Sequence, residues 1–331
     1  MHVLYASDEN YIRHAATSIL SLLDHNRAAD SLTVHFLSMG VTEKSQQAVR
    51  DLAAPYGREV VFYELGDLRR WFDFSFDSKG FAQSTLARLF MARVLPEEVE
   101  RVIYIDCDTV VIDDLQDFFA TPMGNHYLGM VAEPTANKAR RRQLGMPDSQ
   151  PYFNAGILLV NLKLWREENA ENTVLCYYRD KGGNLIAPDQ DAINGAFVGR
   201  ILELAPRYNY GSVQLYYAWK AQKKISHPTP VMAEKDYLAG TEKPAIVHFL
   251  GEERPWRKGN RHPYTPVYEK YLAQTPWKDM PQEDGWQLYF RCFYLFNAVM
   301  KPFPYLRWRI IDSLIPAFMR YRAKQLKKKC G

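Results

Sequence analysis

Two aspartates separated by one residue are the first feature that could do chemistry. Asp106 and Asp108 directly follow the apolar run Arg101–Ile105. Residues two apart on an extended segment point to the same side, so both carboxylates can face one cation. Carboxylate oxygens suit Mg²⁺ and Mn²⁺, which commonly bridge diphosphate oxygens. The pair also fits a simple turn cap, but ionised acids beside a buried strand need a partner.

A histidine at the end of another apolar run could complete a set of metal ligands. His248 lies in the run Ala245–Phe249 and is followed by Gly251 and Arg254. A histidine there also fits a hydrogen-bonded core residue. Glycine lets a backbone approach a phosphate, and arginine can clamp one through two nitrogens. An imidazole beside two carboxylates favours Mn²⁺, with Mg²⁺ as a possible substitute.

Polar residues also follow the first apolar run of the chain. Ala6–Tyr11 reads Ala-Ser-Asp-Glu-Asn-Tyr and comes directly after the predicted strand His2–Ala6. The segment has no GxGxxG motif, which argues against a dinucleotide cofactor. A carboxylate and an amide can still bind a base and a ribose by hydrogen bonds. Asp8 or Asn10 could equally cap the helix that follows.

Three further segments place polar groups beside small or apolar residues. They contain Arg88, Asn154 and the pair Asp189 and Gln190. Each has an ordinary structural interpretation: a surface salt bridge for the arginine, a turn for the asparagine and a helix cap for the aspartate. Their function therefore depends on where the fold places them.

Short apolar runs alternate with segments of helical periodicity, which predicts an α/β fold. Strands separated by helices favour a mostly parallel central sheet with helices on both faces. Ligands in such sheets bind beyond the carboxyl ends of the strands, where Asp106 and Asp108 would lie. The expected strands are His2–Ala6, Leu32–Leu37, Glu59–Leu65, Arg101–Ile105, Phe153–Leu162 and Ala245–Phe249, and the expected helices are Tyr11–Leu23, Thr42–Tyr56, Thr85–Leu95, Thr173–Arg179 and Gln190–Phe197.

The composition is that of a folded protein in a reducing compartment. Of 331 residues, 47% are hydrophobic and 24% are charged. The sequence has no apolar run of the roughly 18–20 residues that a membrane helix needs, and no signal peptide is recognisable. The four cysteines are far apart, which favours neither a disulfide framework nor a zinc site. We therefore expect a cytoplasmic protein.

The C-terminal segment differs from the rest of the chain. Residues 286–331 contain ten Lys and Arg, one acid and eleven aromatic residues, a net charge of +9, whereas the other 285 residues carry −5. Helices at Leu288–Met300 and Arg307–Arg322 would suit the headgroup region of an anionic membrane. A helical cap packed on the domain is the alternative. A nucleic-acid partner is disfavoured, because the folded body is not basic.

As an ordered set, these motifs resemble glycosyltransferase family 8, the retaining enzymes that include bacterial lipooligosaccharide galactosyltransferases and glycogenin. The resemblance runs from about Met1 to Trp256 and implies a GT-A-type, Rossmann-like fold. We therefore expect a glycosyltransferase domain at 1–275, and the composition of the C-terminal segment predicts a helical, membrane-associating tail at 276–331. Six motifs support the resemblance: Ala6–Tyr11, Ala87-Arg88, Tyr104–Asp108, Phe153–Gly156, Asp189–Asp191 and His248–Trp256.

The resemblance implies a role for each matched position. Two departures stand out: the family usually has lysine where this chain has Arg254, and Phe74–Gln83 fits the family poorly. The implied metal ligands are Asp106, Asp108 and His248; the implied nucleotide contacts are Ala6, Asp8, Asn10, Tyr11, Cys107, Gly251 and Arg254; the implied donor-sugar contacts are Arg88, Asp106, Asn154, Ala155, Asp189 and Gln190, of which Asp189 and Gln190 would be catalytic.

The expected function is Mn²⁺-dependent transfer of galactose or glucose from a UDP-sugar to a hydroxyl of a glycan or glycolipid. The expected setting is synthesis of lipopolysaccharide or another envelope polysaccharide at the inner face of the cytoplasmic membrane. A covalent route to retention needs a carboxylate, and Gln190 is an amide, so we expect same-face attack. Two alternatives are an inactive sugar-nucleotide binder or scaffold, and a nucleotidyltransferase. The first predicts a broken ligand set, and the second needs a basic glycine-rich loop where Ser7–Tyr11 is acidic.

Overall fold

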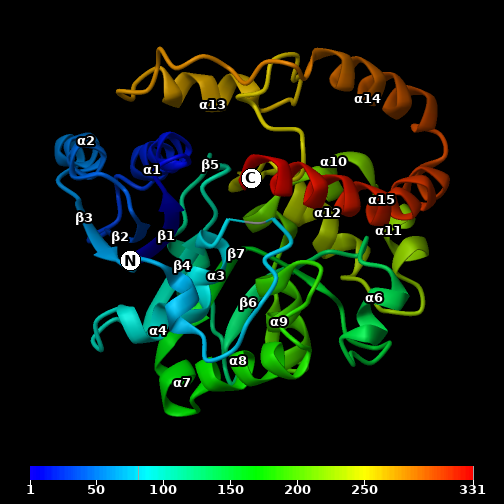
Figure 1. The fold of residues 1–331 in the computed structure, drawn as a ribbon, viewed down its shortest axis with the longest axis horizontal. Helices are drawn as coiled ribbons and strands as arrows, with labels where there is room; N and C mark the ends of the chain where they lie inside the picture. Colours follow the sequence, from blue (N-terminus) through cyan, green and yellow to red (C-terminus); the bar gives the residue numbers. More distant parts are fainter. Residues whose placement is uncertain (81, 331) are drawn as a thin grey trace.

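A seven-stranded sheet forms the centre of the molecule, with helices on both faces (Figure 1). The structure is a computed structural model that describes residues 1–80 and 82–330, with side chains up to residue 317. The strand order is β3-β2-β1-β4-β7-β6-β8. The strands are β1 His2–Asp8, β2 Thr33–Met39, β3 Glu59–Glu64, β4 Arg101–Ile105, β6 Leu128–Ala132, β7 Phe153–Asn161 and β8 Ile201–Glu203.

The directions of the strands bring polar residues to one edge of the sheet. β1, β2, β3 and β4 run parallel, and β7 is antiparallel to both β4 and β6. The carboxyl ends of β1, β4 and β6 therefore meet the start of β7. The predicted fold class, a mostly parallel sheet in an α/β domain, is confirmed.

Both faces of the sheet are buried, which explains the continuous apolar runs of its strands. Successive residues of a strand point to opposite faces. In β1, Val3 and Tyr5 belong to one hydrophobic core, whereas Leu4 and Ala6 belong to the core on the other side. Helix α1 (Ile12–His25) packs its buried face on the first of these cores.

Local signals place the early helices where the sequence predicts them. Helix α2 (Glu43–Ala53) begins after Thr42, whose side chain accepts a hydrogen bond from the Ser45 amide. A short 3-10 turn then leads to Gly57, which has a φ of 64°. This left-handed conformation is the usual helix stop for glycine.

Two predicted elements differ from the structure. The single helix expected at Thr85–Leu95 is wrong: α3 (Ser84–Ala87) and α4 (Met91–Val94) are separated by a 3-10 turn at Arg88–Phe90, where Arg88 turns into the interior. The last expected strand exists as β9 (Ile246–His248), but it pairs with β5 (Thr109–Val111) in a separate two-stranded sheet.

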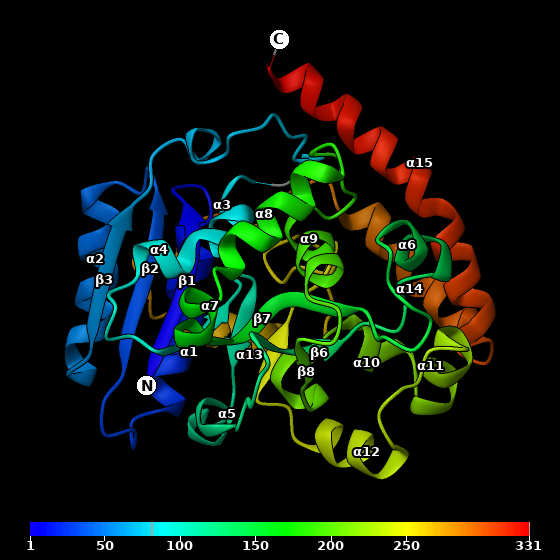
Figure 2. The same ribbon diagram turned by 90° about the horizontal axis from the view of Figure 1, so that it is seen from below.

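The remaining helices cover the sheet and its carboxyl edge. In Figure 2, α15 runs beside α6, α11 and α14, and it contacts α11 and α14. None of the helices in the described part of the chain is both long and apolar enough to cross a membrane. These helices are α5 Gln116–Ala120, α6 Lys138–Gln143, α7 Leu162–Glu167, α8 Ala170–Asp180, α9 Pro188–Ala196, α10 Ser212–Tyr216, α11 Trp219–Ser226, α12 Glu234–Glu242, α13 Thr265–Leu272, α14 Gln287–Met300 and α15 Pro304–Cys330.

Candidate active site

The two aspartates after β4 and the histidine that ends β9 converge on one point. Ligand atoms of Asp106, Asp108 and His248 all lie within 4.8 Å of one another. The Nε2 atom of His248 is 3.2 Å from Asp108 Oδ1 and 3.9 Å from Asp106 Oδ2. Its Nδ1 atom bonds to Asn209 Oδ1 at 2.9 Å, which orients the ring and leaves Nε2 toward the carboxylates.

Strand β7 passes so close to this cluster that only glycine fits. A Cβ atom on Gly156 would lie 2.1 Å from Cε1 of His248 and 3.0 Å from Oδ2 of Asp106. The strand therefore forms the floor of a small polar space. Two carboxylates and one oriented imidazole around it fit a divalent cation.

Burial and mutual charge set the electrostatics of the cluster. Burial raises the pKa of Asp106, against the opposing effect of the Arg88 guanidinium. Burial alone would lower the pKa of His248, but the carboxylates, Asp108 first, raise it above the ordinary value. Both shifts show side chains whose charged states depend on their immediate partners, a common property of functional sites.

Arg88 connects the cluster to α9. Its side chain is 2% exposed. One terminal nitrogen lies 2.7 Å from Asp106 Oδ1, and Nε lies 3.1 Å from Asp189 Oδ2. The guanidinium also donates to the carbonyl of Ala155 and lies 4.3 Å from the ring centre of Tyr104. The arginine is thus a buried cation shared by two acids, and a surface salt bridge is excluded.

Gln190 is held by hydrogen bonds at both ends of its amide. Its Oε1 atom accepts from the Ala155 backbone at 3.0 Å, and its Nε2 atom donates to Tyr152 Oη at 3.0 Å and to Glu133 Oε2 at 3.1 Å. Asn154 donates to the same Glu133 oxygen at 3.0 Å. We call Gln190, Asn154 and Glu133 the Gln190 group.

Sequence reasoning missed Glu133 and Asn209. Glu133 directly follows β6, as Asp106 follows β4, so an acid after the apolar run Leu128–Ala132 was a usable signal. Asn209 ends a short 3-10 turn and bonds both His248 and Asn154, at 2.9 and 2.8 Å. No periodic pattern indicates such a residue.

The candidate phosphate-binding residues lie beside the candidate metal ligands Asp106, Asp108 and His248. One terminal nitrogen of Arg254 is 3.3 Å from Asp108 Oδ2, and its Nε donates to the Gly251 carbonyl at 2.9 Å. Gly251 has a φ of 69°, which suits glycine. The Arg254 guanidinium lies 5.6 Å from the ring centre of Tyr11. The first and last motifs of the sequence therefore meet.

The candidate nucleotide-binding residues at the end of β1 use partly local bonds. Asp8 accepts from the Asn10 amide at 3.0 Å, so it also stabilises the turn. The Cys107 thiol is buried and donates to the Ala6 carbonyl at 3.4 Å. A nucleotide could therefore contact Cys107 only through its backbone.

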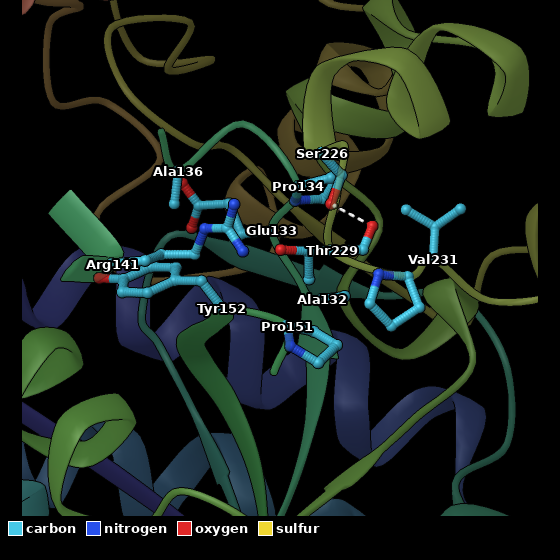
Figure 3. A pocket seen from close by; sticks show the side chains of 11 residues that line it. Ala132, Glu133, Pro134, Ala136, Arg141, Pro151, Tyr152, Ser226, Thr229 and Val231 are labelled. Atoms are coloured by element: carbon cyan, nitrogen blue, oxygen red, sulfur yellow. Dashed lines mark hydrogen bonds between the residues drawn. The ribbon is translucent and has the colours of Figure 1, made fainter. Parts of the chain in front are cut away.

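Glu133 lines a small cavity and a larger one, and the larger of the two can admit a sugar. Figure 3 shows the smaller, which Glu133, Arg141, Tyr152 and Thr229 line; its volume is about 10 Å³. That is roughly the space of one water molecule. The larger cavity, which we call the cleft, has a volume of about 540 Å³ and begins at Glu133 and Asn154. Its size is that of an ordinary ligand site.

The chain is similar in sequence and in fold to several known proteins. General stress protein A of Bacillus subtilis is 26% identical over 280 residues, 84% of this chain and 94% of that protein. Lipopolysaccharide 1,2-glucosyltransferase of Escherichia coli is 24% identical and covers 86% of this chain, and 81% of its own length is matched. The galactosyltransferase LgtC, solved with donor and acceptor sugar analogues, shares the fold with a TM-score of 0.71 at 21% identity, over 87% of this chain and 99% of LgtC.

A match to the sequence model of a protein family covers most of the chain. The model of "Glycosyl transferase family 8" matches residues 2–259, which contain the candidate metal ligands, the Gln190 group and Arg254. A match of this extent defines membership: the chain belongs to glycosyl transferase family 8 and is a glycosyltransferase.

Proposed function

We propose that this enzyme transfers galactose or glucose, with retention, from a UDP-sugar to a hydroxyl of a glycan or glycolipid. The observation that supports this most is the convergence of Asp106, Asp108 and His248 within 4.8 Å, beside Arg254. The names of two relatives support the choice of sugars: one is a glucosyltransferase of Escherichia coli and the other a galactosyltransferase of Salmonella typhimurium.

Each part of the site would hold one part of the donor. A Mn²⁺ ion on the three ligands would neutralise diphosphate charge, and Mg²⁺ is the possible substitute. Arg254 supplies a second positive charge at the diphosphate, and Gly251 leaves room for its oxygens. The uridine would lie against Ala6, Asp8, Asn10, Tyr11 and the Cys107 backbone, and the sugar against Arg88, Asn154, Ala155, Asp189 and Gln190.

The surroundings of Gln190 support same-face attack. A covalent intermediate needs a free carboxylate at the anomeric carbon. Gln190 is an amide, Asp189 is paired with Arg88, and one oxygen of Glu133 already accepts two hydrogen bonds. We infer that the acceptor hydroxyl attacks from the side that the diphosphate leaves, and that a diphosphate oxygen takes its proton.

Gln190→Ala should lower turnover by roughly 100-fold or more, the usual effect of losing one aligned dipole at the reacting centre. The dissociation constant for UDP should change by less than about threefold, because the residue lies on the sugar side. Steady-state kinetics and calorimetry would measure the two effects. Gln47→Ala, an exposed glutamine of α2, is the control. Unchanged turnover, or a sugar adduct in the intact-protein mass spectrum, would contradict the proposed route.

We propose further that residues 276–331 bind an anionic membrane, placing the enzyme at the inner face of the cytoplasmic membrane for envelope polysaccharide or lipopolysaccharide synthesis. Leu288, Leu295 and Val299 are 73%, 68% and 61% exposed and lie on one side of α14. Phe290 and Met300 are buried, so the tail also packs on the domain. The basic residues from position 320 onward lie outside the described side chains.

Family membership sets aside the nucleotidyltransferase interpretation. The inactive-binder interpretation predicts a broken set of ligands, and in this chain all three are present and close together.

The proposed function is tested by UDP release from a panel of nucleotide sugars without acceptor. With the full chain and Mn²⁺, UDP-galactose or UDP-glucose should be hydrolysed slowly, and faster than UDP-N-acetylglucosamine or GDP-mannose. Slow hydrolysis is expected because water can replace the acceptor hydroxyl. No release from either UDP-hexose, or release that EDTA leaves unchanged, would contradict the proposal.

A further inference from the structure

The cleft leads from the Gln190 group to the C-terminal helices. Glu133 and Asn154 line its inner end, next to the proposed sugar position. Phe293 of α14 and Trp308 and Asp312 of α15 also line the cleft. An acceptor that reaches the donor sugar through this cleft would contact both the catalytic domain and the tail.

Arg307 fixes α15 on the domain at the edge of this cleft. It is 5% exposed. Its guanidinium donates to Tyr217 Oη at 2.6 Å and to Asn297 Oδ1 at 2.9 Å, and it lies 4.2 Å from the ring centre of Tyr216. One buried cation thus joins α15 to α14 and to the end of α10.

Two residues on the cleft side of α15 are bonded to the start of α6. Trp308 Nε1 donates to the Thr135 carbonyl at 3.0 Å, and Asn137 donates to Asp312 Oδ1 at 2.8 Å. Thr135 and Asn137 closely follow Glu133 in the chain. These bonds therefore hold this part of α15 at a defined distance from the Gln190 group.

The side chains that line the cleft favour a neutral sugar. Aromatic faces pack against the C–H faces of sugar rings, and carboxylates accept hydrogen bonds from hydroxyls. The aromatic residues include Tyr289 and Phe293, and the acids are Glu133, Glu252, Glu253 and Asp312.

The cationic lining residues already have partners. Arg140 is bonded to Asp191 at 2.9 Å, and Arg307 to Tyr217. A phosphorylated sugar would meet the carboxylates of Glu133 and Asp312, which accept their hydrogen bonds from amide side chains rather than from cations. This disfavours its binding.

We propose that α15 forms part of the acceptor site, and that Trp308 and Asp312 bind the terminal ring of a neutral, hydroxyl-rich glycan. This inference rests on the proposed function, because it takes the cleft to be the route of the acceptor. The tail then selects the acceptor in addition to any contact with lipid.

The test measures UDP release by the full chain, with Mn²⁺ and its preferred UDP-hexose, in the presence of added sugars. Methyl β-galactoside, methyl β-glucoside and lactose are the neutral probes, and galactose 6-phosphate and glucose 6-phosphate are the charged ones. A neutral probe should raise UDP release, and the phosphates should not. In Trp308→Ala, the KM for the active probe should rise, and acceptor-independent release should fall much less. The factor by which the KM rises should be about ten times the factor by which the release falls.

Two further variants separate binding from structure. Phe303→Ala removes a 57% exposed aromatic residue just before α15. It should change neither the KM for the probe nor acceptor-independent release. Asp312→Asn keeps an oxygen for Asn137 but removes the charge, so it should narrow the preference for neutral over phosphorylated sugars about threefold or more.

The outcomes are distinct. Equal losses of sugar-stimulated and acceptor-independent UDP release in Trp308→Ala would overturn the proposal. So would an unchanged preference for neutral over phosphorylated sugars in Asp312→Asn. Stimulation of UDP release by the sugar phosphates alone would also overturn it. The same holds if no sugar tested stimulates UDP release while hydrolysis of the donor proceeds. No release from any donor would instead contradict the proposed function.

Discussion

Replacing His248 with alanine should abolish Mn²⁺-dependent turnover while leaving the protein folded. The change removes one of three ligands and leaves Asp106 and Asp108 as the remaining pair. Losing a residue that hydrogen-bonds to a metal ligand typically lowers metal affinity about 10–100-fold. Losing the ligand itself should therefore lower it by more than about 100-fold. Calorimetric titration with Mn²⁺ and the UDP-release assay would measure the effect, and EDTA should inhibit the intact enzyme, with Mn²⁺ restoring it better than Ca²⁺.

A second variant tests the same site without removing a ligand. Gly156→Ala places a methyl group 2.1 Å from His248 Cε1, so it should weaken Mn²⁺ binding as His248→Ala does. His126→Ala, a partly buried histidine outside the cluster, is the control and should bind Mn²⁺ normally. Full activity in EDTA, or normal Mn²⁺ affinity in His248→Ala, would rule out the metal assignment.

Replacing Arg88 with methionine should give the largest loss of stability. Methionine fills much of the same volume but leaves the partly buried Asp106 and the buried Asp189 without their cation. Removing one partner of a buried ion pair costs about 3–5 kcal/mol of unfolding free energy. Urea unfolding without metal would measure it, and Mn²⁺ should restore part of the loss by neutralising Asp106.

Arg93→Met is the matched control for this experiment. Arg93 is an ion-pair partner of Glu171 with a side chain that is 52% exposed. Solvent screens the half-exposed arginine, although Glu171 is only 13% exposed, so this variant should lose clearly less stability than Arg88→Met. If Arg88→Met lost no more stability than Arg93→Met, the pairing of Arg88 with Asp106 and Asp189 would not matter to the fold.

The sequence sufficed for the elements that have strong local signals. β1, β2 and β4 are buried on both faces and therefore read as apolar runs. Thr42 and Gly57 mark helix ends through their own chemistry. The acids after β4 were recognisable because a strand that ends in charge has few structural explanations. The family resemblance added the order of the motifs.

Features that depend on distant partners could not be predicted. The pairing of β9 with β5 joins three-residue strands more than 130 positions apart, and no local pattern records it. Arg88 looked like a surface cation on a helix, because its partners Asp106 and Asp189 are remote in sequence. Glu133 is a different case: its position after the apolar run of β6 was recognisable, but its hydrogen bonds with Asn154 and Gln190 depend on distant segments.

His248 belongs to the two-stranded sheet, whereas Asp106 follows a strand of the main sheet. An ion bound by both would join segments that are far apart in the chain, so part of its binding free energy would become folding free energy. At a free concentration 100 times the dissociation constant, a ligand that binds only the folded state contributes about 2.7 kcal/mol. The supply of metal in the cell would then set how long each molecule survives heat and proteolysis, as well as how fast it works.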